Sequence, residues 1–373
     1  MKTLARVLLS LPAWFAFSAC GAQRESGAPN TGGVMAGGST SGGSTSTGGT
    51  ADSSGGAMIT NFSNSNGTEA LPTPTGDASV PRPSGSAANL KVLDWAGFKA
   101  AVSYTFDDAN ASQLEHYDEL QALGVHYTFY LITSKTEAAS PVWQQALKDG
   151  HELGNHTRNH LQTATELEID SATTFIQTKF DAPVWTMASP YGSGTFVPLA
   201  RTRFLLNRGV VNGLIAPNDS TDPFNTYCFI PATGATADVF NAQIDAARTA
   251  GDWRIVLVHG FAGSSDGAYQ PVSIDEFSAS VTHAKDFGDL WIDTMANVGA
   301  YWRGQKLFTG VQPVTTGSDT TWTWTLPAHF PPGRVLRVTV DGGTLSQAGS
   351  ELSWDAHGYY EVALDAGTLT LSP

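Results

Sequence analysis

Residues 100–108 read AAVSYTFDD and decide the fold class, because a short apolar, β-prone run ends there on two adjacent carboxylates. Apolar or aromatic residues at helical spacing follow in residues 113–123, and Gly124 ends that predicted helix. Residues 127–132 predict the next strand and residues 142–148 the next helix. Strands that alternate with helices in this way favour a parallel α/β architecture.

Later segments extend this architecture. Residues 255–258 read IVLV and are wholly apolar, as buried parallel strands are. Residues 273–283 and 290–301 have helical patterns, although the latter could begin as a strand at residues 291–292. We therefore expect residues 89–305 to form one α/β domain whose catalytic groups lie at the carboxyl ends of its strands.

The character of the sequence changes after about Lys306. Short β-prone runs occupy residues 320–325, 335–340 and 359–364, and turns that contain glycine separate them. We expect residues 306–373 to form a small all-β, sandwich-like domain.

The first 20 residues resemble a secretory signal. Lys2 and Arg6 precede an apolar run at residues 7–17, and small residues then lead to Cys20. That ending resembles a bacterial lipoprotein cleavage site, which implies export and a lipid anchor on Cys20 in the cell envelope, at the outer membrane or cell surface. An ordinary signal peptide with a chance cysteine is the alternative. A lipidated Cys20 would leave Cys228 without a disulfide partner.

The composition predicts a tether behind this signal. Residues 21–88 are mostly Gly, Ser, Thr, Asn and Pro, and such a segment buries too little apolar area to offset chain entropy. We expect a disordered linker that lets the globular part reach polymer away from the membrane. The whole chain has 34 acidic and 20 basic residues, a net charge of -14, which argues against a nucleic-acid partner.

Three groups of side chains could carry chemistry. Asp107 and Asp108 end the first strand, although an acidic pair alone is usually a solvated loop. His156 and His160, four residues apart, could lie on one face of a helical turn and reach one ion. His259 directly follows the apolar strand at residues 255–258, where a lone histidine is more often structural.

A zinc-protease motif does not fit this chain. His151 and Glu152 begin such a pattern, but Asn155 stands where the second histidine is needed, so we expect His151 to be structural. The combination of the three groups is more specific. One carboxylate and two histidines suffice for a catalytic zinc-type site, and a second carboxylate and a third histidine remain for proton transfer.

Four ordered motifs resemble the polysaccharide deacetylases, the family-four carbohydrate esterases. Thr-Phe-Asp-Asp stands at residues 105–108 and His-Thr-x-x-His at residues 156–160. Pro-Tyr-Gly stands at residues 190–192 and Leu-x-His at residues 257–259. The resemblance extends over roughly residues 88–303.

The resemblance implies a distorted (β/α) barrel and metal-dependent removal of acetyl groups from a polysaccharide, such as a chitin-like polymer or peptidoglycan. It implies one divalent ion, zinc first, with cobalt, manganese or nickel as alternatives. The implied roles are metal ligation by Asp108, His156 and His160, general base catalysis by Asp107, proton donation by His259, and oxyanion stabilisation by the backbone N–H of Tyr191.

The chain departs from the family pattern at several positions. Ala188 stands where many members have an arginine that orients the base, and Ala109 replaces the usual glycine. Asp219 and Asp222 are loose candidates for a carboxylate that tunes His259. These departures affect substrate class and turnover more than metal binding.

Three alternatives stay open at this level. One is an acetylxylan-type O-acetyl esterase, and another is a surface glycan-binding protein that has kept its metal but lost turnover, which intact Asp107 and His259 argue against. In the third, the β domain is the adhesive part, with Trp322 and Trp324 stacking on sugars if they are exposed. Alternating tryptophans on a strand are more often packed against neighbouring strands.

Overall fold

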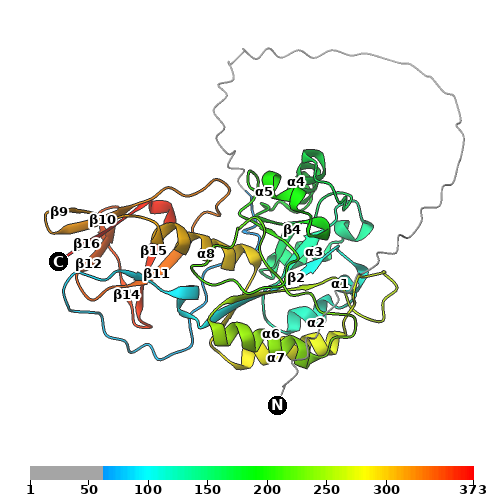
Figure 1. The fold of residues 1–373 in the computed structure, drawn as a ribbon, viewed down its shortest axis with the longest axis horizontal. Coiled ribbons are helices and arrows are strands. Elements are labelled where there is room, and N and C mark those ends of the chain that lie inside the picture. The colour runs from blue at the N-terminus through cyan, green and yellow to red at the C-terminus, as the bar shows by residue number, and fades with distance from the viewer. Residues whose placement is uncertain (1–61) are drawn as a thin grey trace, which may run out of the picture. The chain divides into compact units, whose positions relative to one another are not determined.

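A computed structural model describes residues 62–373 of the chain (Figure 1). The predicted signal, Cys20 and residues 21–61 of the predicted linker lie outside the described residues. Across residues 62–373, no helix has the length and apolar character needed to cross a bilayer.

A parallel sheet forms the centre of the first domain. Its strands run in the order β6-β5-β4-β3-β2-β7, and β8 also pairs with β2. In the register, Phe106 of β2 lies between Phe129 and Val258, and all eight residues of β2 are buried. The strands are β2 (Ala100–Asp107), β3 (Thr128–Leu131), β4 (Glu152–Asn155), β5 (Thr186–Ala188), β6 (Leu206–Arg208), β7 (Trp253–Val258) and β8 (Leu290–Ile292).

Helices connect these strands and cover the sheet, with α6 and α7 side by side in Figure 1. The side chains of Thr165, Ser273 and Thr294 cap α4, α7 and α8 by accepting a bond from a backbone N–H of the first turn. The helices are α1 (Ala111–Glu115), α2 (Tyr117–Ala122), α3 (Val142–Lys148), α4 (Glu166–Phe180), α5 (Val197–Ala200), α6 (Ala237–Ala250), α7 (Ile274–Asp286) and α8 (Met295–Thr309).

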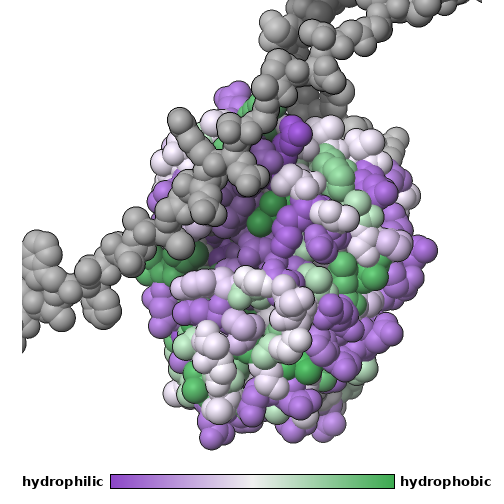
Figure 2. Space-filling model, turned by 90° about the vertical axis from the view of Figure 1, so that its right-hand side faces the viewer, coloured by the Kyte–Doolittle hydropathy of each residue, from purple (hydrophilic) through white to green (hydrophobic). Residues whose placement is uncertain are grey.

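The barrel is distorted because β6 and β7 do not pair as strands. An irregular segment, residues 209–230, lies between them and makes isolated bridges, from Thr226 to Arg208, from Ile215 to Trp253 and from Phe229 to Val256. The predicted α/β architecture of the barrel is confirmed. The face in Figure 2 is mostly hydrophilic, and its hydrophobic residues form small, separate patches.

The C-terminal region forms two antiparallel sheets, in the orders β1-β11-β15-β14 and β13-β12-β16-β10-β9. Buried and partly exposed residues alternate along β12 and β16, as expected of strands with one face in a core. The predicted all-β fold is confirmed. The strands are β1 (Lys91–Val92), β9 (Val314–Thr316), β10 (Asp319–Thr323), β11 (Val335–Thr339), β12 (Thr344–Gln347), β13 (Ser350–Glu351), β14 (Trp354–Asp355), β15 (Tyr359–Ala363) and β16 (Thr368–Ser372).

One hydrophobic cluster joins the two regions. Trp253 and Trp302 of the barrel belong to the same buried cluster as Leu336 and Leu369 of the β sheets. Trp324 is buried in this cluster, where its indole N–H donates to the Leu364 carbonyl, so Trp324 serves packing. The boundary expected after residue 305 therefore does not separate two independent cores.

The prediction of a disordered linker is wrong for residues 62–88. Asn66 is fully buried, and its side chain both donates to the Leu153 carbonyl (2.9 Å) and accepts from the Leu153 N–H (2.7 Å). The Thr294 hydroxyl donates to the Gly67 carbonyl (2.6 Å). Composition misled the prediction because polar bonds hold much of this segment, together with apolar contacts of Leu71 and Ala87. We call residues 62–92, the last two of which form β1, the N-terminal strap.

Candidate functional site

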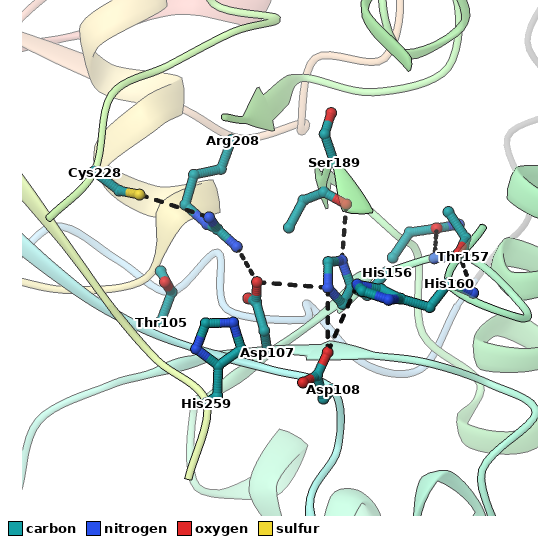
Figure 3. Close-up of polar contacts among 12 residues, drawn as sticks. Thr105, Asp107, Asp108, His156, Thr157, His160, Ser189, Arg208, Cys228 and His259 are labelled. Carbon is teal, nitrogen blue, oxygen red and sulfur yellow. Dashed lines mark hydrogen bonds and ion pairs between the residues drawn. The ribbon is translucent and has the colours of Figure 1, made fainter. Parts of the chain in front are cut away.

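The candidate site lies at the carboxyl ends of the parallel strands (Figure 3). Asp107 is the last residue of β2, His156 directly follows β4 and His259 directly follows β7. Because parallel strands end at the same edge of a sheet, segments far apart in the sequence bring these side chains together.

Asp108, His156 and His160 form the candidate metal centre. Each offers one ligand atom, and these atoms all lie within 4.8 Å of one another. Asp108 Oδ1 is 3.5 Å from His156 Nε2 and 3.9 Å from His160 Nε2. Although this oxygen is buried, it has no hydrogen-bond partner in the described part of the chain. One carboxylate oxygen and two imidazole nitrogens are a donor set that suits a divalent cation of the zinc type.

The backbone sets the orientation of His156. Its Nδ1 lies 2.9 Å from the Ala188 carbonyl at the end of β5, so Nδ1 carries the hydrogen and Nε2 is free toward Asp108. A ligand histidine fixed in this way presents its lone pair without rearrangement. The residues present therefore fit a bound cation.

His156 and His160 do not lie on a helical turn, and that prediction is wrong. Residues 156–160 form an irregular loop in which Thr157 and His160 have φ values of 64° and 56°. The loop is closed by its own polar groups, since the His160 N–H donates to the Thr157 hydroxyl (3.0 Å). The Asn159 backbone and side chain both donate to Glu168 of α4 (2.7 Å). The rings nevertheless lie 4.7 Å apart.

Asp107 has a partner that the sequence analysis did not identify. Arg208, the last residue of β6, is fully buried, and its Nη2 donates a hydrogen bond to Asp107 Oδ2 (Figure 3). Asp107 Oδ1 is buried and has no hydrogen-bond partner among residues 62–373. The available signal was a charged residue at the end of the apolar stretch FLLNR, residues 204–208, because such a residue is rarely buried unpaired.

Tyr191 and His259 flank the metal centre. Tyr191 has a φ of 55°, is 65% exposed, and its ring lies 4.5 Å from that of His160. The His259 carbonyl accepts bonds from the amides of Asn110 (2.7 Å) and Gln113 (2.8 Å). The His259 ring lies edge-on to Tyr269 at 5.2 Å.

The two loose candidates for tuning His259 have other roles. Asp219 accepts bonds from the backbone N–H groups of Ala216 and Thr221, and so closes its own turn. Asp222 forms an ion pair with Arg201 (2.7 Å). We therefore assign neither carboxylate to the tuning of His259, because each forms its contacts within its own loop or with Arg201.

Burial and charge shift the titrations in this cluster. Burial raises the pKa of Asp108, but the nearby imidazoles of His156, His259 and His160, His156 foremost, lower it more, so the net pKa is below the usual value. Burial, reinforced by the charge of His156, lowers the pKa of His160 to about 4. Burial also lowers the pKa of His259, against the attraction of Asp107.

His151 and Glu152 lie at the opposite, amino end of β4. His151 is fully buried and its Nδ1 accepts the N–H of Tyr127 (3.1 Å), so it is structural as expected. Glu152 accepts bonds from Thr128, Thr186 and the N–H of Ala296 in the first turn of α8. Burial nevertheless raises the pKa of Glu152 to about 7.

Part of the chain is similar to known proteins. Residues 97–203 match the sequence model of the family described as polysaccharide deacetylase. A stretch of 147 residues is 30% identical to a gellan lyase from a Bacillus species and spans 37% of this chain but only 6% of that protein.

Two solved structures resemble the chain at 18% identity, each over 53% of this chain and 89% of its own. One is a family 4 acetyl xylan esterase from Clostridium thermocellum in complex with a cobalt ion, with a TM-score of 0.37. The other is the peptidoglycan deacetylase PdaC from Bacillus subtilis, with a TM-score of 0.36. Residues 97–203, which include Asp107, Asp108, His156 and His160, thus match the polysaccharide deacetylase family.

Proposed function

We propose that this site hydrolyses acetyl groups on a polysaccharide, with an N-acetylated glycan such as a chitin-like polymer or peptidoglycan as the first candidate. The observation that carries the proposal is the cluster of Asp108, His156 and His160 beside Asp107 and His259. The match of residues 97–203 to the polysaccharide deacetylase family supports it.

Asp108, His156 and His160 would hold one divalent cation. Zinc is the first candidate, and cobalt, manganese and nickel are alternatives, because imidazole and carboxylate ligands accept all four. When bound, such an ion supplies Lewis acidity that polarises the acetyl carbonyl and lowers the pKa of water by several units.

The remaining side chains would move the protons. Asp107 takes a proton from the attacking water on Oδ1, because Oδ2 already accepts the bond from Arg208. The N–H of Tyr191 donates to the oxygen that gains charge as water adds to the carbonyl carbon. His259 then gives a proton to the leaving amine or alcohol, the bond to the acetyl carbon breaks, and acetate is released.

The test is acetate release from chitin oligomers, peptidoglycan and acetylxylan. The purified protein is first stripped with a chelator and then assayed alone and with each of the four metals. We expect release from an N-acetylated polymer only in the presence of metal. Faster release from acetylxylan would assign the O-acetyl esterase alternative, and no release from any polymer with any metal would contradict the proposal.

We also propose that Cys20 carries a lipid that anchors the protein in the bacterial cell envelope. The charged start, the apolar run at residues 7–17 and the small residues before Cys20 support this proposal. An anchored enzyme would act on polymer near its membrane.

A further inference from the structure

We propose that Arg208 is the positioning residue of the general base, delivering from β6 the guanidinium that fixes Asp107. This inference rests on the proposed function, because it gives Arg208 a task only if Asp107 accepts a proton. The residues lie 101 positions apart in the chain, so the pair exists only in the folded barrel.

The pair is isolated from solvent. Arg208 is fully buried and the side chain of Asp107 is 4% exposed. Arg208 Nη1 donates to the Gly209 carbonyl (2.9 Å), which fixes the plane of the guanidinium while Nη2 reaches Asp107. A buried charge needs such a partner, since the loss of either member would leave the other unpaired.

The barrel interior is shaped around this guanidinium. The ring of Tyr130 lies beneath it at 5.4 Å, and a side chain at Gly154 would overlap that ring. On β5, Ala188 is in register with Arg208, and residues paired across parallel strands point to the same side of the sheet. The small side chain of Ala188 therefore leaves the space beside β6 to Arg208.

The contact makes the two oxygens of Asp107 unequal. Oδ2 accepts from Arg208 and lies 3.5 Å from His156 Nε2, whereas Oδ1 has no partner. Arg208 thus fixes the orientation of the carboxylate through Oδ2 and leaves Oδ1 available to accept a proton. Without Arg208 the carboxylate would be free to rotate, and the base would be misplaced.

The experiment is a kinetic cycle of Arg208→Met, Asp107→Asn and the double variant, with kcat, KM and metal content measured for each. We expect Arg208→Met to lower kcat roughly 10- to 100-fold with KM and metal content close to the parent's. In the Asp107→Asn background it should cause no further loss. Equal losses in both backgrounds would mean a general structural role and would overturn the inference, as would a parent-like kcat in Arg208→Met.

Arg254 on β7 offers a matched control. It is 4% exposed and donates to the Gly213 carbonyl (2.7 Å) and to Asn212 (3.0 Å). Arg254→Met should therefore affect stability but leave kcat near the parent value. Arg208→Lys should recover part of the lost rate, because lysine keeps the charge but cannot make both bonds. The double variant Arg208→Ala with Ala188→Arg should have a higher kcat than Arg208→Ala alone, because it returns an arginine to the position beside residue 208.

Urea unfolding of the same cycle does not depend on activity. Arg208→Met should lower stability in the parent, where it leaves a buried carboxylate unpaired, and much less in the Asp107→Asn background. If the two substitutions changed the free energy of unfolding additively, the pairing would be overturned even if the enzyme is active. If the parent releases no acetate while the unfolding cycle shows coupling, the proposed function fails and the pairing stands.

Discussion

Asp107 and Asp108 are neighbours in the chain but have different surroundings. Asp108 Oδ1 faces two imidazoles, whereas Asp107 Oδ2 is held by Arg208. This difference lets one carboxylate hold an ion while the other accepts a proton, since a carboxylate bound to a metal is a poor base.

We therefore predict opposite phenotypes for the two aspartates. Asp107→Asn should keep most of the metal and lose about 10²–10⁴-fold in rate, the usual contribution of a general base. Asp108→Asn should weaken metal binding, and excess metal should restore part of its activity. His259→Ala should keep its metal and lose turnover. The check is metal content measured beside rate.

The reverse pattern would exchange the roles. If Asp107→Asn lost its metal while Asp108→Asn kept it, Asp107 would be the ligand. If Asp107→Asn and His259→Ala both turned over at the parent rate, the proposed mechanism would be wrong for this chain.

At the scale of elements, Glu152 joins β4 to the first turn of α8 and gives stability a pH dependence. Its pKa is raised to about 7, so between roughly pH 4.5 and 7 the native state binds more protons at this group than the unfolded chain does. Its contribution to stability is thus complete below about pH 4.5 and is lost as the pH rises through 7. The expected slope is at most about 1.4 kcal/mol per pH unit.

The measurement is urea unfolding of the parent and Glu152→Gln between pH 4.5 and 8. Glutamine can still bond Thr128, Thr186 and Ala296 but does not titrate. The stability of the parent relative to Glu152→Gln should fall across this range. If the stability of the parent relative to Glu152→Gln were constant or rose with pH, the raised pKa of Glu152 would be contradicted.

The N-terminal strap fills a gap between two strands. Strands β4 and β5 pair at a single position, Asn155 with Met187. The side chain of Asn66 forms hydrogen bonds with both the N–H and the carbonyl of Leu153, as the backbone of a neighbouring strand would. Arg334 and Arg337 also donate to strap carbonyls. The strap is thus part of the fold despite its polar composition.

We predict that the strap is required for stability. Asn66→Ala should cost about 2–3 kcal/mol, because it leaves buried backbone groups of β4 without partners. A chain that begins at residue 87 should be far less stable than one that begins at residue 62, in thermal or urea unfolding. Equal stability of these two chains would show that the strap contacts contribute nothing.

For the whole molecule, the anchoring proposal predicts where the protein is found in the cell. Cys20→Ser should block processing or release the protein from the membrane fraction, because lipid attachment needs the cysteine sulfur. Cys228→Ser is the matched control, since it removes the other cysteine, which is buried, and should not change fractionation. A correctly processed Cys20→Ser protein that still sediments with membranes would contradict the anchor.

Local sequence patterns predicted much of the molecule. Apolar runs predicted β2 and β7, and helical spacing predicted one helix where the structure has α1 and α2, because these elements are set by residues near in the chain. Asp107, Asp108 and His259 were expected at strand ends, and the family resemblance implied that His156 and His160 join them.

Arg208 was not predicted, since its partner is 101 residues away and the charge that ends the apolar stretch at residues 204–208 does not identify that partner. The prediction of a helical turn at residues 156–160 was wrong because a hydrogen bond to the Thr157 hydroxyl closes this loop.

The pairing of β1 with β11 has a consequence for the order of events during synthesis. Lys91 pairs with Thr339, so the two partners are 248 positions apart in the chain (339 − 91) and are made at different times. The joint hydrophobic cluster likewise needs side chains from Trp95 to Leu371. Contacts over such separations form slowly. We therefore expect the nascent chain to reach its native state only after the strands up to β16 have emerged from the ribosome, and not piece by piece.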